Sequence, residues 1–524
     1  MPFVPDTQNK EFQDALNLIQ YTRQSVFLTG KAGTGKSTFL RYICGHTKKK
    51  HVVLAPTGIA AINAGGSTLH SFFKLPFYPL LPDDPNFSLQ RGRIHEFFKY
   101  TKPHRKLLEE LELVIIDEIS MVRADIIDAV DRILRVYSRN LREPFGGKQL
   151  LLVGDVFQLE PVVKGDEREI LNRFYPTPYF FSARVFNQID LVSIELQTVY
   201  RQTDKVFVSV LDHIRNNTVG AADLQLLNTR YGTQIELSEA DMYITLATRR
   251  DNVDYINDKK LAELPGDPVT FHGEITGDFP ESSLPTSQEL VLKPGAQIIF
   301  IKNDFDRRWV NGTIGIVSGF DPIEETLYVI TDDGKECDVK RESWRNIRYK
   351  YNEEKKQIEE EELGTFTQYP VRLAWAITVH KSQGLTFSRV VIDFTGGVFA
   401  GGQAYVALSR CTSLEGIQLR KPISRADVFV RPEITGFAER FNNRQAIDRA
   451  LKQAQADVQY AAAAKAFDKG DFETFLNEFF KAIHSRYDIE KPVVQRLIRK
   501  KLNIINQLRE ENRALKPVSY THLT

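Results

Sequence analysis

The chain has 524 residues, a length that suggests three or four domains, and its 42% hydrophobic and 26% charged residues are typical of an ordinary soluble protein. Its formal net charge of +1 excludes a chain that is basic overall, so any affinity for nucleic acid must come from local clusters of Lys and Arg. Its three cysteines lie far apart, which argues against a disulfide framework and against a Cys-rich zinc site.

The first residues do not combine a basic segment with an apolar one, as a signal peptide does, and no stretch is apolar over roughly 18 residues. We therefore expect neither export nor a membrane span. The expected location is a reducing cytoplasm, with association with the nucleoid if the source is bacterial.

A glycine-rich loop is the first functional pattern along the chain, and it follows the apolar run at 26–28. Residues 30–38, GKAGTGKST, meet every fixed position of the phosphate-binding pattern G-x-x-x-x-G-K-[ST]. Its glycines can take positive φ and carry no side chain, so backbone N–H groups can turn inward around a phosphate. The expected nucleotide-binding residues here are Gly30, Gly33, Thr34, Gly35, Lys36, Ser37 and Thr38.

Two side chains of this loop have particular tasks. Lys36 is expected to reach the β- and γ-phosphates, and the Ser37 hydroxyl is a ligand for a magnesium ion. Residues 38–43 predict a helix whose N-terminal dipole also favours negative charge. ATP and Mg²⁺ are the expected cofactors; the alternative is a chance glycine-rich turn.

An acidic pair ends the apolar run at 113–116. Asp117 is expected to hold magnesium, and Glu118 to act as the general base that polarises the attacking water. The alternative is a strand that ends in a solvated acidic turn. A third apolar run, at 149–155, leads to Gln158, which is placed to sense the γ-phosphate or to orient the water.

Strand-like and helical patterns alternate along the first part of the chain, which predicts a parallel sheet flanked by helices. A second α/β unit is indicated by the apolar runs at 242–247 and 389–393. Three strand-like runs within 291–363 predict a small β-barrel between them. Residues 74–108 are read as an insertion, and the chain beyond about residue 432 as helical.

Ordered blocks over residues 7 to about 430 resemble the superfamily-one DNA helicases of the petite-integration-frequency (Pif) type, close to the RecD-like enzymes that move 5′→3′. The blocks are APTGIAA at 55–61, GGSTLHSF at 65–72, DEISM at 117–121, PFGG at 144–147, GDVFQL at 154–159, LQTVYRQ at 196–202, AITVHKSQGLT at 376–386 and YVALSR at 405–410. The resemblance implies an α/β fold with two RecA-like parallel-sheet lobes, an inserted wedge, an inserted small β-barrel and a C-terminal helical extension. The domain boundaries expected are 1–185 for the first lobe with its insertion at 74–108, 186–290 and 364–430 for the second lobe, 291–363 for the barrel, and 431–524 for the extension.

The resemblance also implies roles for residues outside the phosphate loop. Arg201 and Arg410 would stabilise the γ-phosphoryl transition state from the second lobe, although a salt bridge is the commoner role of a single arginine. A glutamine near the first helix would read adenine, and Gln8 and Gln13 both fit, with spacing in favour of Gln13. The residues expected to line a DNA strand are Thr57, Thr68, His70, Phe72, Thr378, His380, Lys381 and Ser382.

Four parts of the chain keep more than one interpretation. The insertion from Gln90 to Lys106 mixes basic and aromatic residues, as a wedge at a duplex junction would, or it is a solvated basic helix. Phe72 stacks on a base or packs in the core. The barrel gates the strand path or makes no DNA contact, and the tail at 495–516 is a solvated or partner-binding helix.

The function implied is an ATP-dependent 5′→3′ DNA helicase that translocates on single-stranded DNA and separates duplex, with repair, recombination and telomere maintenance as the processes served. The alternative is a DNA-stimulated ATPase that binds or remodels DNA without unwinding it. The expected partners are single-stranded DNA and tailed or forked duplex, with G-quadruplex or RNA–DNA hybrid as further substrates. We expect a monomer and no membrane partner.

Overall fold

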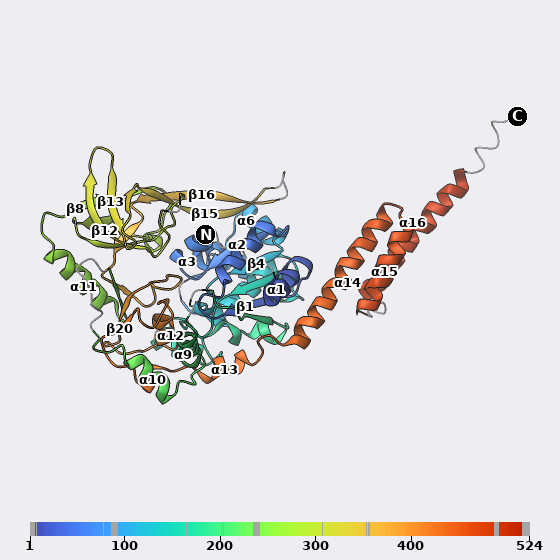
Figure 1. Cartoon of the computed structure of the whole chain (residues 1–524). Coiled ribbons are helices and arrows are strands. Elements are labelled where there is room, and N and C mark those ends of the chain that lie inside the picture. Colours follow the sequence, from blue (N-terminus) through green and yellow to red (C-terminus); the bar gives the residue numbers. More distant parts are fainter. Residues whose placement is uncertain are drawn as a thin grey trace. The chain divides into compact units, whose positions relative to one another are not determined.

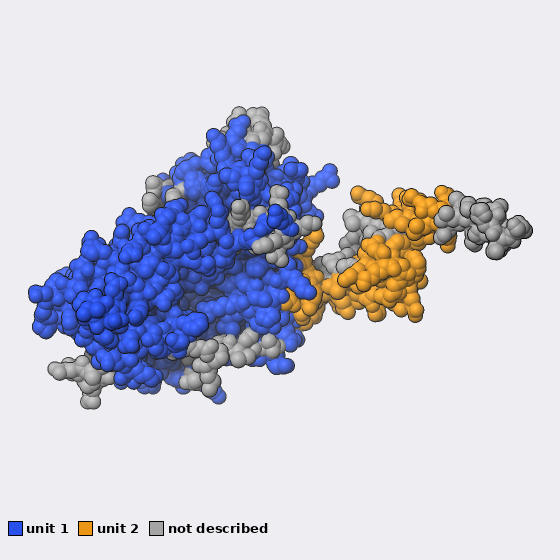
Figure 2. Space-filling view, turned by 90° about the horizontal axis from the view of Figure 1, so that it is seen from above, with its two compact units in different colours: residues 1–16, 24–443 blue, residues 17–23, 444–524 orange. Residues whose placement is uncertain are grey.

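The computed structural model describes residues 6, 8–76, 78–84, 93–163, 165–200, 202, 204–233, 242–306, 308–352, 354, 357–486 and 492–515. The chain forms two compact units, one of residues 1–16 and 24–443 and one of residues 17–23 and 444–524. Figure 2 distinguishes them by colour. The sites predicted from the sequence all belong to the first unit.

A six-stranded sheet forms the first lobe, with the order β3-β2-β4-β5-β1-β6 and every neighbouring pair parallel. Figure 1 labels two of its strands, β1 and β4. Its central strands β4 and β5 are short, largely apolar runs that are buried throughout, as expected for a parallel sheet covered on both faces. The strands are β1 Val26–Gly30, β2 His51–Ala55, β3 Ser67–Thr68, β4 Leu113–Ile116, β5 Gln149–Val153 and β6 Val192–Leu196. The helices of this lobe are α1 Lys10–Tyr21, α2 Lys36–His46, α3 Gly58–Ala64, α4 Leu69–Phe73, α5 Arg93–Phe97, α6 Lys102–Glu110, α7 Ala124–Tyr137 and α8 Gly165–Leu171.

The first lobe extends further along the chain than the expected boundary at residue 185. Strand β6 pairs with β1 along its whole length, from Val26 opposite Val192 to Gly30 opposite Leu196. The boundary was placed too early because a single edge strand leaves no mark in the sequence that assigns it to one sheet or the other.

The insertion at 74–108 is also more firmly packed than a free wedge. Phe98 and Tyr100 are buried in the core of the first lobe, where the Tyr100 hydroxyl donates to the carbonyl oxygen of Phe73 at 2.5 Å. These two rings are therefore not available to a duplex junction, contrary to expectation. Gln90, Arg91 and Gly92 lie outside the described residues, while Lys99 and Lys102 are exposed.

A four-stranded parallel sheet, β18-β7-β19-β20, forms the second lobe, as predicted from the apolar runs at 242–247 and 389–393. Its strands are β7 Ile244–Ala247, β18 Ala376–Thr378, β19 Val390–Asp393 and β20 Ile417–Leu419. The helices are α9 Lys205–Arg215, α10 Ala221–Asn228, α11 Arg250–Glu263 and α12 Gln403–Leu408. Both lobes are thus parallel α/β units, which confirms the predicted fold class.

Antiparallel sheets are inserted into the second lobe over a longer range than the 291–363 expected. A five-stranded sheet, β14-β13-β12-β11-β17, shares one core with the two-stranded sheet β10-β8. The difference arises because β8 and β17 complete this core from outside the predicted range. The strands are β8 Val269–His272, β10 Glu289–Leu292, β11 Gln297–Phe300, β12 Ile314–Asp321, β13 Thr326–Thr331, β14 Glu336–Val339 and β17 Val371–Leu373.

A third antiparallel sheet, β15-β16-β9, is dominated by a long hairpin whose strand β15 contacts helix α6 of the first lobe. Ile347 of β15 is buried in the core of that lobe. The three strands are β9 Glu274–Gly277, β15 Glu342–Asn352 and β16 Gln357–Gln368.

The chain beyond residue 431 is helical, as predicted, but its first helix belongs to the first unit. In α13, Pro432–Ala438, the ring of Phe437 packs on those of Phe27 and Phe181. These aromatic contacts move the start of the extension from residue 431 to residue 444.

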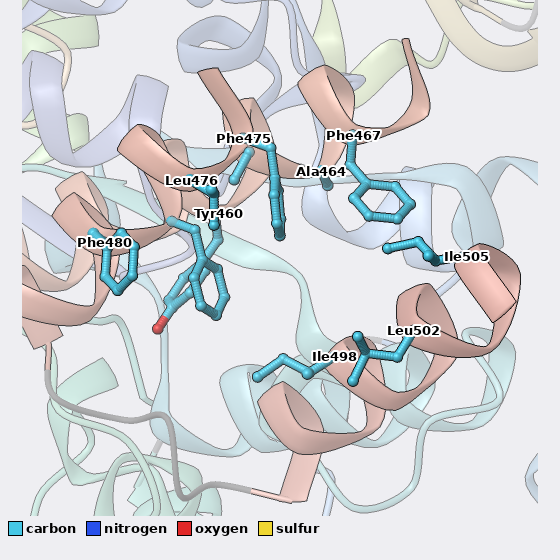
Figure 3. A pocket seen from close by; sticks show the side chains of 11 residues that line it. Tyr460, Ala464, Phe467, Phe475, Leu476, Phe480, Ile498, Leu502 and Ile505 are labelled. Atoms are coloured by element: carbon cyan, nitrogen blue, oxygen red, sulfur yellow. The ribbon is translucent and has the colours of Figure 1, made fainter. Parts of the chain in front are cut away.

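The second unit contains α14 Arg444–Asp468, α15 Phe472–Arg486 and α16 Pro492–Leu515. The α14 and α15 helices form a hairpin in which the rings of Phe467 and Phe475 lie 5.1 Å apart. Figure 3 shows the apolar pocket that side chains of α14, α15 and α16 line, among them Phe467, Phe475 and Leu502. Within the described part of the chain, no helix is both long enough and apolar enough to cross a bilayer.

Candidate active site

The glycine-rich loop joins the end of β1 to the start of α2, as its sequence predicts. Gly33 and Gly35 have φ of 81° and 90°, in the region that favours glycine. A Cβ on Gly30 would lie 2.5 Å from Thr34 Oγ1 and 2.9 Å from the carbonyl oxygen of Leu196, so no side chain fits there. Helix α2 begins after Gly35 with no side-chain cap, and the first N–H groups of any α-helix have no acceptor within the helix.

Lys36 lies over this loop. Its Nζ donates to the carbonyl oxygens of Gly30 at 2.7 Å and Lys31 at 3.0 Å, and Thr34 Oγ1 donates to the carbonyl of Lys31 at 3.0 Å. Ser37 is exposed at the start of α2, and Thr38 is half-buried. A cation, the N–H groups of a helix start and an exposed hydroxyl fit the phosphates and magnesium ion of a bound nucleotide.

Asp117 and Glu118 follow β4, next to the loop. Glu118 has φ of 49°, unusual for a residue with a Cβ, and its N–H donates to Asp117 Oδ1 at 2.9 Å. Burial raises the pKa of both carboxyls, and the Asp117 charge adds to burial in raising that of Glu118 to about 7. Lys36 and Arg410 oppose this rise in the pKa of Glu118, so both cations act on the same carboxyl.

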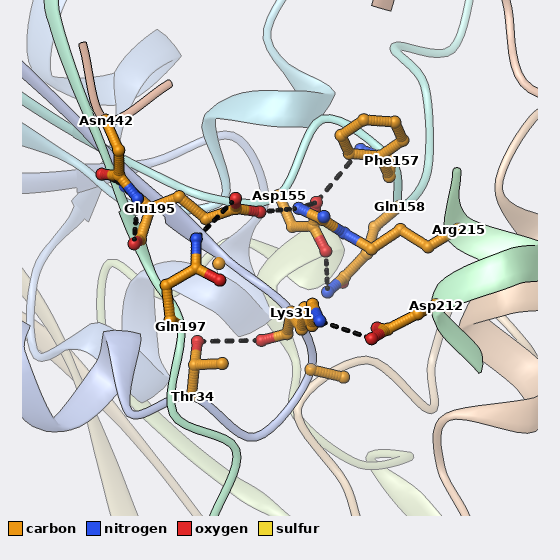
Figure 4. Close-up of polar contacts among 12 residues, drawn as sticks. Lys31, Thr34, Asp155, Phe157, Gln158, Glu195, Gln197, Asp212, Arg215 and Asn442 are labelled. Carbon is orange, nitrogen blue, oxygen red and sulfur yellow. Dashed lines mark hydrogen bonds and ion pairs between the residues drawn. The ribbon is translucent and has the colours of Figure 1, made fainter. Parts of the chain in front are cut away.

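Asp155 and Gln158 follow β5, the neighbour of β4. Gln158 Nε2 lies 3.4 Å from Asp155 Oδ2, and the Gln158 N–H donates to the carbonyl of Asp155 at 3.0 Å (Figure 4). The Asp155 charge is also among the causes that raise the pKa of Glu118. The three predicted catalytic elements therefore meet at the carboxyl edge of the first sheet.

The two candidate adenine-binding glutamines lie near the N-terminal end of α1. Gln8 is in an exposed turn, and its N–H donates to Asp6 Oδ1 at 3.1 Å. Gln13 is exposed on α1 next to Phe12, whose ring packs on Phe39 of α2 at 4.9 Å. Neither contact selects one glutamine, so this choice stays open.

The second lobe contributes Arg410, whereas Arg201 lies outside the described residues. Arg410 is only 2% exposed, and its Nε donates to the carbonyl of Val406 at 3.0 Å. The residues on either side of Arg201 in the sequence contact the phosphate loop and the segment around Arg410. Tyr200 N–H donates to the carbonyl of Gly33 at 2.9 Å, and Gln202 Nε2 donates to the carbonyls of Ser409 and Cys411 on either side of Arg410.

On the first lobe, the predicted DNA residues differ in what they expose. Thr57 and Thr68 are N-caps of α3 and α4, and their hydroxyls accept from the N–H groups of Ala60 and Ser71. His70 is half-buried, and burial lowers its pKa. Phe72 is 3% exposed and packs in the core, so the prediction that it stacks on a base is wrong in this structure.

On the second lobe, Thr378 Oγ1 accepts from the N–H of Lys381 at 3.2 Å, and burial lowers the pKa of both His380 and Lys381. Ser382 is fully buried, and its hydroxyl donates to the carbonyl of Val379 at 2.8 Å. Ser382 therefore shapes this turn and does not present its side chain to a ligand, contrary to prediction.

Sequence reasoning missed two residues, one beside His380 and one at the nucleotide site. The first, Phe399, is 60% exposed and lies parallel to His380, with ring centroids 6.4 Å apart. The only sequence signal for it was the glycine pairs at 396–397 and 401–402 on either side. Arg215, at the end of α9, contacts Asp155 from 60 residues away, and no spacing in the sequence indicates this.

Known proteins resemble this chain over the residues that form the nucleotide site. The model of the PIF1-like helicase family matches residues 4–223. The ATP-dependent DNA helicase Pif1 of Bdellovibrio bacteriovorus is 31% identical over 84% of this chain and 94% of its own length. The ATP-dependent DNA helicase PIF1 of Rattus norvegicus is 34% identical over 76% of this chain, which spans 58% of the rat protein's length.

Solved structures agree in fold. Bacteroides sp Pif1 in complex with ADP-AlF4 has a TM-score of 0.75 and 42% identity, over 82% of this chain and 96% of its own. Bacteroides Pif1 bound to ssDNA has a TM-score of 0.59 and 41% identity, over 83% and 97%. With identity above 30% across nearly whole relatives, this chain belongs to the Pif1-like helicase family.

Proposed function

We propose that this chain is an ATP-dependent DNA helicase that translocates 5′→3′ on single-stranded DNA and separates duplex. The observation that carries the proposal is the contact of both lobes at the phosphate loop, where Lys31 Nζ lies 2.5 Å from Asp212 Oδ2 and the N–H of Ala32 donates to the Tyr405 hydroxyl at 3.0 Å. Family relatives named as ATP-dependent DNA helicases, and a relative solved with ssDNA, support the same function. Two lobes that share one site can convert hydrolysis into motion, because each state of the nucleotide favours a different fit between them.

In this mechanism Lys36 and the N–H groups at the start of α2 hold the β- and γ-phosphates. Ser37 and Asp117 would hold a magnesium ion, which when bound neutralises charge that develops on those phosphates. Glu118 takes the proton of the attacking water, a task suited to a carboxyl whose pKa is raised towards neutrality. Gln158 orients that water, and Arg201 and Arg410 stabilise the transferring phosphoryl group.

The DNA partners that we propose are single-stranded DNA and tailed or forked duplex, held by Thr57, Thr68, His70, Thr378, His380, Lys381 and, as an addition, Phe399. Phosphate contacts from hydroxyls, N–H groups and cations do not read sequence, and an exposed ring can stack on any base. G-quadruplex and RNA–DNA hybrid substrates, a monomeric state, a cytoplasmic or nucleoid location and roles in repair, recombination and telomere maintenance stay predictions.

A DNA-stimulated ATPase that does not unwind duplex is the second candidate. The burial of Phe98 and Tyr100 favours it, because it removes two of the three aromatic rings that a wedge at residues 90–106 would use. The proposed wedge now depends on the exposed basic residues of the insertion.

Charge reversal in the insertion separates the two candidates. Lys99→Glu with Lys102→Glu changes two exposed side chains and leaves the core intact. For a helicase we expect strand separation of a forked duplex to fall at least about fivefold while hydrolysis stimulated by single-stranded DNA stays within about twofold. Lys48→Glu, at the exposed turn before β2, is the control. A parent chain that hydrolyses ATP but separates no forked duplex would favour the second candidate.

A further inference from the structure

The last turn of helix α9 contacts two loops of the nucleotide site, the phosphate loop and the loop after β5. Asp212 and Arg215 are three residues apart, so they lie on one face of this helix, whose apolar side packs in the core of the second lobe. Asp212 Oδ2 lies 2.5 Å from Nζ of Lys31 in the phosphate loop. Arg215 Nη2 lies 3.2 Å from Oδ1 of Asp155, after β5 (Figure 4).

Arg215 is held in place more firmly than a surface arginine would be. It is 3% exposed, and the same Nη2 that faces Asp155 lies 2.8 Å from Glu195 Oε1. Its guanidinium lies over the ring of Phe157, 4.2 Å from the centroid. Its Nε has no hydrogen-bond partner among the described residues. A buried cation is costly unless paired, so these two carboxylates fix where Arg215 lies.

Asp155 is shared between Arg215 and the glutamine of the catalytic site. Its Oδ1 accepts from the N–H of Phe157 and from Arg215, while its Oδ2 is the acceptor for Gln158 Nε2. The same loop is confined from another side, because a Cβ on Gly402, the N-cap of α12, would lie 2.3 Å from the carbonyl oxygen of Gln158. Arg215 of α9 and the Gln158 amide therefore contact the two oxygens of one carboxylate.

We propose that Arg215 is a positioning residue: through Asp155 it holds the Gln158 side chain in its working orientation, and so couples closure of the second lobe to hydrolysis of ATP. This inference rests on the proposed role of Gln158 in the nucleotide site. Asp212, through Lys31, gives the same helix turn a second hold on the phosphate loop.

A double-mutant cycle between Arg215→Gln and Gln158→Ala tests the proposal. We expect Arg215→Gln to lower kcat at saturating single-stranded DNA at least about tenfold, with the Kd for a non-hydrolysable ATP analogue changed less than about threefold. In the Gln158→Ala background the same change should lower kcat less than about twofold, because the residue through which Arg215 acts is already gone. Arg215→Lys, which keeps the cation, should recover part of the loss.

The control is Arg431→Gln, which breaks a second arginine–carboxylate pair on the same loop, Arg431 Nε to Glu160 Oε2 at 2.6 Å. The Arg431 side chain is 34% exposed, and its loss should leave kcat within about twofold. Equal fold losses in both backgrounds, or no loss from Arg215→Gln, would overturn the proposal. If Arg215→Gln does not fold, Arg215→Met, which also removes the cation, is taken through the same cycle with the same criteria. Failure of the proposed function is seen separately, as a parent chain without DNA-stimulated hydrolysis.

Discussion

Lys36 Nζ lies 2.7 Å from the carbonyl oxygen of Gly30, so the lysine that is proposed to hold the nucleotide is held by its own loop. Phosphate oxygens would replace these carbonyls as acceptors, since a charged acceptor binds an ammonium group more strongly than a neutral one.

Lys36→Ala and Glu118→Gln should abolish turnover by different routes. Lys36→Ala removes the phosphate-binding cation, so we expect it to weaken nucleotide binding. Glu118→Gln keeps the shape of the side chain but removes the base, so ATP should stay bound and unhydrolysed. Nucleotide Kd and single-turnover hydrolysis distinguish the two, with Lys48→Ala, at an exposed lysine outside the site, as control. Normal hydrolysis by either variant would refute the site assignment.

Arg201→Ala and Arg410→Ala should each lower the hydrolysis rate at least about 10²-fold, somewhat below the range for arginines that contact the transferring phosphoryl group. Nucleotide affinity should change much less. Because Arg410 is buried on carbonyls of its own lobe, its variant needs a melting curve beside the kinetics. Parent rates for both variants in saturating single-stranded DNA would mean that neither arginine has this role.

Phe399→Ala should weaken DNA binding, whereas Phe72→Ala should lower the stability of the fold. Loss of the exposed Phe399 ring removes stacking of about 1–3 kcal/mol per base, so the Kd for single-stranded DNA should rise about fivefold or more. Phe72→Ala leaves a cavity in the core and should cost about 3–5 kcal/mol of stability, with the DNA Kd of the folded fraction unchanged. Anisotropy titrations measure the Kd for DNA and melting curves measure stability. The reverse pattern would mean that Phe72, and not Phe399, contacts the DNA strand.

His104 should make the first lobe less stable in acid. Burial, and after it the charge of Lys74, lowers the pKa of this side chain from 6.5 to about 4. The unfolded chain therefore binds more protons between these values, and the stability from neutral His104 is full above pH 6.5 and lost as the pH falls towards 4. At 1.4 kcal/mol per pKa unit the loss is about 3 kcal/mol.

Hydrogen exchange of α6, corrected for the intrinsic effect of pH, measures this loss of stability. His104→Phe should flatten the dependence between pH 6.5 and 4.5, since its ring can keep the stacking on Tyr100 without titrating. An unchanged slope in that variant would assign the acid sensitivity to other groups.

Sites formed by residues that are adjacent in the sequence could be predicted from it. Contacts between residues far apart in the sequence could not. The glycine loop, the acidic pair after β4 and Gln158 each lie where a strand meets its following segment, so order along the chain fixes their place in a parallel sheet. Phe72 and Ser382 were wrongly predicted to contact DNA. Their motifs indicate a DNA-binding segment but do not say which of its side chains are buried in the core. Arg215 became visible only when α9 met the loop after β5.

The most direct test of the central proposal is strand separation on duplexes that carry a 5′ tail, a 3′ tail or no tail, each with and without ATP. The account predicts that the 5′-tailed duplex alone is opened, that opening requires ATP, and that Glu118→Gln abolishes it. Opening of only the 3′-tailed duplex would contradict the polarity. DNA-stimulated hydrolysis without opening of any duplex would contradict the helicase itself.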